Sequence, residues 1–280
     1  MMSQTAPEGE PHFVITMREH LAMCGQMARA YGNNTFERLD PYEEVVYAVD
    51  NHDRGWDDYD QNPGIDPNTQ LPYLMSRTPT PDAVKTNKAS PDFNEVYHPY
   101  SGLLSSMHTW GLYNKRYGLT QFVIRGRTAP TIPVQNTARP QIDAMLAEEV
   151  ERQQRLKSKL AASPKTQPWL DEKRVFQNYK QLTFFDTLSL YFHLYHASER
   201  GDEVYVHVPM NAEADSNVIV KKVSDGVYSL DPFPFANDRL KLTCRGRYTQ
   251  PFAPDFDPSK VGAALKALPT DVQTYELIAA

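Results

Sequence analysis

The spacing of apolar residues changes near Gly201, and this change constrains the fold more than any other feature of the chain. Before Gly201, apolar residues recur mainly with the period of an α-helix. After it they alternate as in a β-strand, and Asp225-Gly226 is a typical hairpin turn. The pattern predicts a mostly α-helical body over residues 13–200 and a small antiparallel β-sheet appendage in a C-terminal extension over residues 201–280.

Polar segments, turn residues and prolines divide the first 200 residues further. The polar residues 1–12 predict a disordered N-terminus, and residues 57–93, rich in Pro, Asp and Asn, predict a long ordered loop over an active site. A Thr- and Pro-rich stretch over 125–139 predicts a surface connection. Apolar spacing and start signals predict helices over 13–31, 41–53, 98–113, 141–160 and 168–195.

Composition excludes several classes of protein. The 280 residues carry a net charge of −6, which argues against non-specific nucleic-acid binding. No apolar run approaches the roughly 18–20 residues of a membrane span, and the two distant cysteines, Cys24 and Cys244, form no disulfide framework. We therefore expect a cytoplasmic protein that acts on a small-molecule substrate, without nucleic-acid or membrane partners.

The dipeptide His52-Asp53 ends the second predicted helix and is followed by Gly55, which would let the chain leave the helix without a Cβ penalty. Side chains at a helix end can reach forward to one cation. His20, in the middle of the first helix, and Asp186, in the last, would complete a set of two imidazoles and two carboxylates. Such a set favours Mn²⁺, Fe²⁺, Co²⁺, Ni²⁺ or Zn²⁺ over Ca²⁺.

Asp186 lies in a nearly all-apolar stretch, where an unpaired carboxylate is costly to bury. His98 and His108 are ten residues apart on one predicted helix, so they point about 80° apart. They are expected to flank a cavity rather than chelate one ion side by side; one would then bind a second metal and the other contact substrate. His193, His196 and His207 are interpreted as ordinary histidines.

Five stretches of the chain carry a resemblance. They are Glu19-His20-Leu21-Ala22, His52-Asp53-Arg54-Gly55-Trp56, Leu103-Leu104-Ser105-Ser106-Met107-His108, Phe185-Asp186-Thr187-Leu188-Ser189-Leu190-Tyr191 and Asp231-Pro232-Phe233-Pro234-Phe235. The order of the His and Asp residues resembles the HD superfamily of metal-dependent phosphohydrolases. The chain resembles more closely an uncharacterised bacterial family, domain of unknown function 3891. The resemblance implies an HD-domain-like helical bundle with one or two divalent metal ions.

The implied activity is hydrolysis of a phosphate ester or related small molecule by metal-activated water. Asp53 and either His98 or His108 would be catalytic, and Arg54, Lys85 and Lys88 would bind phosphate. Trp56 stands where many HD enzymes have Lys or a small residue, and it would give the site an apolar wall. This wall favours a substrate less anionic than a nucleotide.

Two alternatives remain open. An HD-type di-iron oxygenase would use O₂ to oxidise a small organic substrate, with ligands His20, His52, Asp53, His98, His108 and Asp186. A metal-stabilised, non-catalytic binding module would use the C-terminal sheet to contact a partner.

Overall fold

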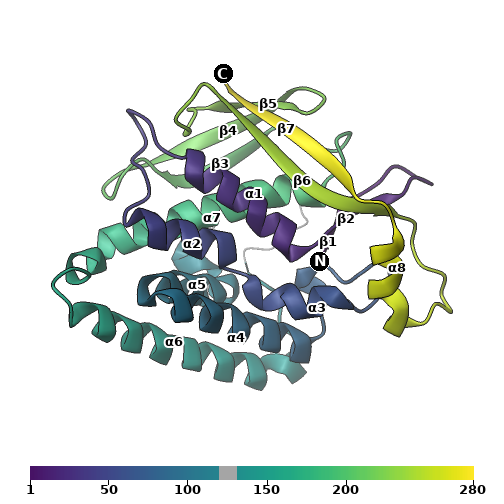
Figure 1. Cartoon of the computed structure of the whole chain (residues 1–280), viewed down its shortest axis with the longest axis horizontal. Helices are drawn as coiled ribbons and strands as arrows, with labels where there is room; N and C mark the ends of the chain where they lie inside the picture. Colours follow the sequence, from purple (N-terminus) through teal and green to yellow (C-terminus); the bar gives the residue numbers. More distant parts are fainter. Residues whose placement is uncertain (120–130) are drawn as a thin grey trace.

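A seven-stranded mixed sheet lies along one side of the protein, and helices pack beneath it (Figure 1). The computed structural model describes residues 1–119 and 131–280. Next to the sheet lie α1 (Met17–Ala30) and α7 (Glu172–Leu194), which contact strands β6 and β3 respectively. Further from the sheet are α2 (Tyr42–Asn51), α4 (Thr80–Tyr97), α5 (Pro99–Tyr113) and α6 (Arg139–Ala161).

The strand order is β1-β2-β6-β7-β5-β4-β3. The neighbours are antiparallel except β5 and β7, which are parallel. The bounds are β1 (Met2–Ser3), β2 (His12–Ile15), β3 (Glu203–Pro209), β4 (Asp215–Ser224), β5 (Val227–Asp231), β6 (Arg239–Thr249) and β7 (Asp271–Ala279).

The prediction of a mostly α, HD-like bundle with a small antiparallel appendage is therefore wrong. The sheet is larger, it is mixed, and two of its strands come from the first 15 residues. These strands are two and four residues long, too short to show alternation, and β2 finds its partner β6 more than 200 residues away. Pairing at such sequence separation leaves no local signal in the sequence.

The N-terminus is also ordered, contrary to prediction. Met2 pairs with Ile15, and both side chains are fully buried. The helix predicted over 13–31 accordingly begins only at Met17, where Thr16 caps it by accepting a hydrogen bond from the Glu19 backbone N–H.

The stretch over 57–93 is not a single loop. It contains α3 (Asp57–Gln61), a 3₁₀ turn (Met75–Arg77) and most of α4. Pro79 and Pro81 lie at the start of α4, where the missing N–H of proline leaves no helical bond unmade, so these prolines begin a helix instead of preventing one. Pro91 is tolerated inside the helix.

The other helical predictions are confirmed by α2, α5, α6 and α7, and the hairpin at Asp225-Gly226 joins β4 and β5. The connection predicted over 125–139 lies partly outside the described residues; its described part includes a 3₁₀ turn (Asn136–Ala138). The last helix is α8 (Val261–Ala267). None of the described helices is both long and apolar enough to cross a membrane.

The main core lies between the sheet and the α1/α7 layer. Along β6 burial alternates, with Leu242 and Cys244 buried and Lys241 and Thr243 exposed, as expected for a sheet with one face packed on helices. The central part of α7 is buried nearly all round because it packs between the sheet and the remaining helices. This placement carries Asp186 into the interior.

Candidate metal centre

Four helices bring five His and Asp side chains to one buried place. His20 comes from α1, His52 caps the C-terminus of α2 and is followed by Asp53, His108 comes from α5 and Asp186 from α7. None of the five residues is more than 3% exposed. In the middle of the molecule, α7 contacts α1, α2 and α5, and α2 also contacts α1 and α5 (Figure 1).

Four pairs of their donor atoms lie as close as two ligands of one ion. Nε2 of His20 is 3.3 Å and Nε2 of His52 is 3.9 Å from Oδ1 of Asp186. Asp53 Oδ2 lies 3.8 Å from His52 Nε2, and Asp53 Oδ1 lies 3.6 Å from His108 Nε2. Ligands with bonds of about 2.1 Å to one ion lie at most about 4.2 Å apart. All four separations meet this limit.

Three of these donor atoms have no hydrogen-bond partner. They are His52 Nε2, Asp53 Oδ1 and Asp186 Oδ1, each fully shielded from solvent. Buried polar atoms in folded proteins are almost always satisfied, so three orphans in one cluster require an explanation. Two groups of donors that share His52, namely His20-His52-Asp53 and His52-His108-Asp186, each lie within ligand range of one another, so the residues present fit a metal ion.

Hydrogen bonds behind the cluster orient two of the imidazoles. Nδ1 of His52 lies 2.9 Å from the Val49 carbonyl, so this nitrogen must carry the proton and Nε2 keeps its lone pair. The Ser189 hydroxyl donates to the Asp186 carbonyl at 2.8 Å and accepts from His20 Nδ1 at 2.7 Å. In the neutral ring, His20 Nε2 is thus an acceptor that faces the Asp186 carboxylate, so a proton or a metal ion between them would satisfy both atoms.

The electrostatics of the cluster agree. Burial alone would lower the pKa of His20, but Cys24 and Asp186 outweigh it and raise that pKa to about 10. Burial would raise the pKa of Asp186, yet His20 and Arg116 hold it well below its usual range, so its carboxylate is ionised. The His20–Asp186 contact therefore attracts a cation, whether a proton or a metal ion.

His108 is held neutral. Burial lowers its pKa to about 4, and the neighbouring His52 and Arg116 act in the same direction against the opposing charge of Asp53. Its ring centroid lies 4.6 Å from that of His52. A neutral imidazole is the form that binds metals or donates a single N–H hydrogen bond.

Arg116 was missed by the sequence analysis. Its Nη1 lies 3.1 Å from Asp186 Oδ2, and the guanidinium is largely buried. Arg116 belongs to three successive non-glycine residues with left-handed backbone, with φ of 50°, 47° and 60° at Lys115, Arg116 and Tyr117. Such strain persists where surrounding structure enforces it, often at functional sites. No sequence pattern marks this position.

Two further neighbours of His20 were also missed. His193, interpreted as ordinary, places Nδ1 3.3 Å from His20 Nδ1, and burial keeps the pKa of His193 well below its usual value. The Cys24 sulfur lies 3.8 Å from His20 Nε2. Helical spacing was the available signal, because His193 follows Asp186 by two turns and Cys24 follows His20 by one.

His98 does not join the cluster. It caps the N-terminus of α5, where its Nδ1 accepts a hydrogen bond of 3.1 Å from the Tyr100 backbone N–H, and its ring packs near Trp169. The flanking arrangement expected for His98 and His108 is thus not formed, because His98 sits at the opposite end of the helix from the buried ligands.

The three predicted phosphate-binding cations lie outside the site as well. Arg54 pairs with Asp57 at 2.8 Å, and Lys88 pairs with Glu148 at 2.5 Å on the surface. Lys85 is exposed. None of them lines the cavity next to the cluster.

This inner cavity has a volume of about 60 Å³ and reaches Asp53, His108 and Asp186. That is space for a few water molecules or the reacting end of a small ligand. Its walls are mainly apolar, as the sequence predicts for Trp56; the apolar members are Trp56, Met75, Leu112, Ile132, Pro133 and Leu190.

Gly55 has a different role from the one expected. Its φ is not in the left-handed region. A Cβ on Gly55 would instead lie 2.1 Å from the Thr86 carbonyl oxygen, and the Gly55 N–H donates to Ser90 Oγ at 3.0 Å. The glycine therefore allows α4 to approach the turn that follows Asp53.

Comparison with known proteins gives one match. A family model described as "Protein of unknown function (DUF3891)" matches residues 4–250. No curated protein and no solved structure matches the chain. The HD resemblance therefore stays a prediction. The matched range includes all five clustered His and Asp residues and every strand except β1 and β7. The chain belongs to the DUF3891 family of proteins of unknown function.

Proposed function

We propose that this chain is a metal-dependent hydrolase that uses one divalent transition-metal ion to cleave a small ester, phosphate esters included. The observation that carries the proposal is a set of three buried, unpartnered donor atoms, on His52, Asp53 and Asp186, which belong to two groups of possible metal ligands that share His52.

The ion would be held by His20, His52, Asp53 and Asp186. This mixture of imidazoles and carboxylates suits Mn²⁺, Fe²⁺, Co²⁺, Ni²⁺ or Zn²⁺. Two triads lie within ligand range, His20-His52-Asp53 and His52-His108-Asp186, and both need His52. Because Nδ1 of His52 is occupied by Val49, only Nε2 can bind, which favours a single ion.

When bound, such an ion lowers the pKa of a coordinated water and so supplies a nucleophile at neutral pH. The protein contributes the surroundings. Asp53 can accept a hydrogen bond from the attacking water, and neutral His108, beside Asp53, can donate one to the leaving oxygen. Arg116 keeps Asp186 ionised, and the apolar wall that includes Trp56 limits access of bulk water.

The di-iron oxygenase has less support. Its six-ligand set included His98, which caps α5 and faces Trp169 instead. The five remaining ligands form two groups that both need His52, and its one free nitrogen can bind only one iron. A non-catalytic metal site agrees with the same ligands but leaves the cavity beside them without a role.

The test combines metal content with turnover. The full chain is reconstituted with each candidate metal, metal per chain is measured by mass spectrometry, and carboxylic and phosphate esters are offered as substrates. We expect one metal per chain and hydrolysis that Asp53→Asn abolishes. Asp58→Asn, an exposed aspartate five residues away, is the matched control and should behave as wild type.

Three results contradict the proposal. Metal binding without turnover of any ester favours the binding module. Two redox-active irons per chain favour the oxygenase. An Asp53→Asn protein that retains full activity removes the assigned site.

A further inference from the structure

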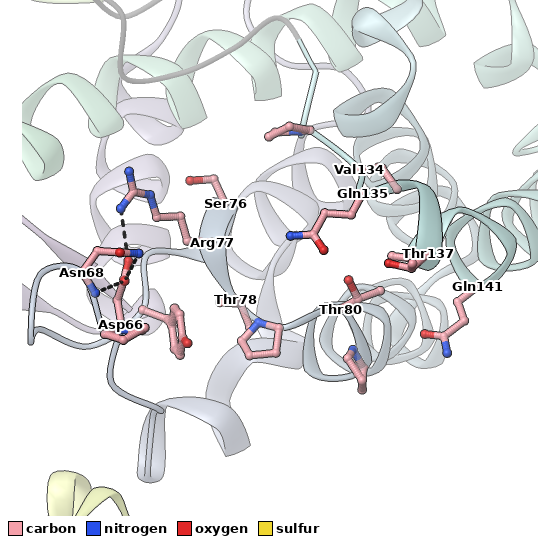
Figure 2. Close-up of a pocket in the computed structure, with 16 residues that line it drawn as sticks. Asp66, Asn68, Ser76, Arg77, Thr78, Thr80, Val134, Gln135, Thr137 and Gln141 are labelled. Carbon is pink, nitrogen blue, oxygen red and sulfur yellow. Dashed lines mark hydrogen bonds and ion pairs between the residues drawn. The ribbon is translucent and has the colours of Figure 1, made fainter.

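The inner cavity adjoins a much larger chamber. None of the site residues predicted from the sequence is among the described residues that line it. The chamber has a volume of about 790 Å³, and Ser76 and Pro133 line both spaces. Its size falls within the range of about 300–1,000 Å³ that is usual for ligand pockets. Figure 2 shows Asp66, Asn68 and Arg77 on one side and Thr137 and Gln141 on the other, with Gln135 between them.

The described lining of this chamber is balanced in charge. It contains one cation, Arg77, and one anion, Asp66, and the two form an ion pair at 3.2 Å. Oδ1 of Asp66 also accepts hydrogen bonds from the backbone and side-chain nitrogens of Asn68. The carboxylate is therefore fully engaged, whereas Arg77 is 55% exposed and keeps further N–H donors. The two charges cancel, so the described lining has no net charge to attract a charged ligand.

The remaining lining offers neutral hydrogen-bonding groups beside ring surfaces. The side chains of two glutamines and a threonine, Gln135, Gln141 and Thr137, make no hydrogen bond to another described residue. The aromatic ring of Tyr73 and several prolines add apolar surface. An apolar ligand would leave the amides unsatisfied, and a polyanion would find among the described lining residues only one cation, which is already paired with Asp66.

We infer that this chamber binds a neutral, hydroxyl-rich ligand such as a sugar or polyol. Hydroxyl groups both donate and accept, which matches amide side chains, and the C–H faces of a sugar ring can pack on Tyr73 and proline. The inference rests on the proposed function in one respect, namely that the reacting end of this ligand enters the inner cavity past Ser76 and Pro133. Binding in the chamber itself requires no metal.

The test is ligand-observed NMR on the full chain, treated with chelator and untreated. The probes are neutral mono- and disaccharides and sorbitol; glucuronate and glucosamine are probes of similar size that carry opposite charges. We expect neutral probes to bind with or without metal, and neither charged probe to bind more tightly. The double variant Gln135→Ala/Gln141→Ala should weaken binding about three- to tenfold for each hydrogen bond lost.

Gln154→Ala is the matched control, because Gln154 is exposed on the same helix α6 but does not line the chamber. It should bind as wild type, and all three proteins should melt alike, since exposed substitutions change stability little. The inference is overturned if no neutral probe binds, if the double variant binds as wild type, or if a charged probe binds tenfold more tightly. Metal content and ester hydrolysis are measured separately. A chamber that binds no neutral probe therefore leaves the hydrolase proposal intact, and an absence of hydrolysis leaves the proposal of sugar binding intact.

Discussion

Replacing Asp53 by Asn should have different effects on the stability of the protein with and without metal. The side chain is 4% exposed, its Oδ1 has no hydrogen-bond partner, and it faces His52 and His108 at 3.8 and 3.6 Å. Asn keeps the shape but removes the charge. Without metal, an uncompensated buried charge is lost, so the variant should be as stable as wild type or more so. With metal, an anionic ligand is missing.

The size of the difference can be estimated. At a metal concentration of 1,000 times Kd, binding stabilises the wild type by about 4.1 kcal/mol. Loss of a supporting group weakens metal affinity by about 10–100-fold, and loss of a direct ligand should reach the upper end. A 100-fold weaker variant would gain about 1.4 kcal/mol at the same concentration. At about 2–4 °C per kcal/mol, the metal-dependent rise in Tm falls from ~8–16 °C to ~3–6 °C.

Thermal denaturation followed by circular dichroism, with each metal and with chelator, measures both states. Asp58→Asn, an exposed aspartate, should reproduce the wild-type increment. The reasoning fails if Asp53→Asn shows the same metal-dependent increment as wild type, or if it is much less stable than wild type in chelator. In either case Asp53 is a structural residue and no metal ligand.

Four further substitutions test the residues around Asp53. His20→Asn should lose the metal and His98→Asn should retain it, because His98 only caps a helix, a role that Asn also fills; metal analysis of the two proteins compares them directly. Ser189→Ala should weaken metal affinity by about 10–100-fold, with little change in Tm under chelator, since the hydroxyl only orients His20; equal affinity in a metal titration would refute this. Gly55→Ala should lower the free energy of unfolding by about 1–3 kcal/mol with or without metal, because its Cβ would meet the Thr86 carbonyl, and urea denaturation measures it.

The predicted metal residues illustrate what sequence reasoning can reach. Asp186 was identifiable because an aspartate in an apolar helix must have a partner, and His52-Asp53 because the pair ends a helix with clear start signals. His98 was wrongly grouped with His108, since both lie on one helix and only packing decides which end is buried. Arg116 reaches Asp186 through a strained backbone that no residue type announces.

Proline caused the main local error. Residues 80–93 were assigned to a loop, yet Pro79 and Pro81 begin α4 and Pro91 lies inside it. In the sequence alone, a proline at the start of a helix looks the same as a proline in a loop. Only the contacts of the folded chain distinguish the two. Here α4 packs against α5 and the turn at Gly55, and this packing favours the helix.

Local patterns in the sequence were enough to predict five of the six described helices of ten or more residues, the hairpin at Asp225-Gly226, and the residue types of a candidate metal site. Local periodicity, capping and the cost of burying a carboxylate act within a few turns of the chain and are readable there. The mixed seven-stranded sheet, the clustering of His20, His108 and Asp186 around His52, and the chamber nearby became visible only in the folded structure. These features depend on contacts between segments far apart in sequence. Such contacts stabilise the protein only after folding has brought the segments together.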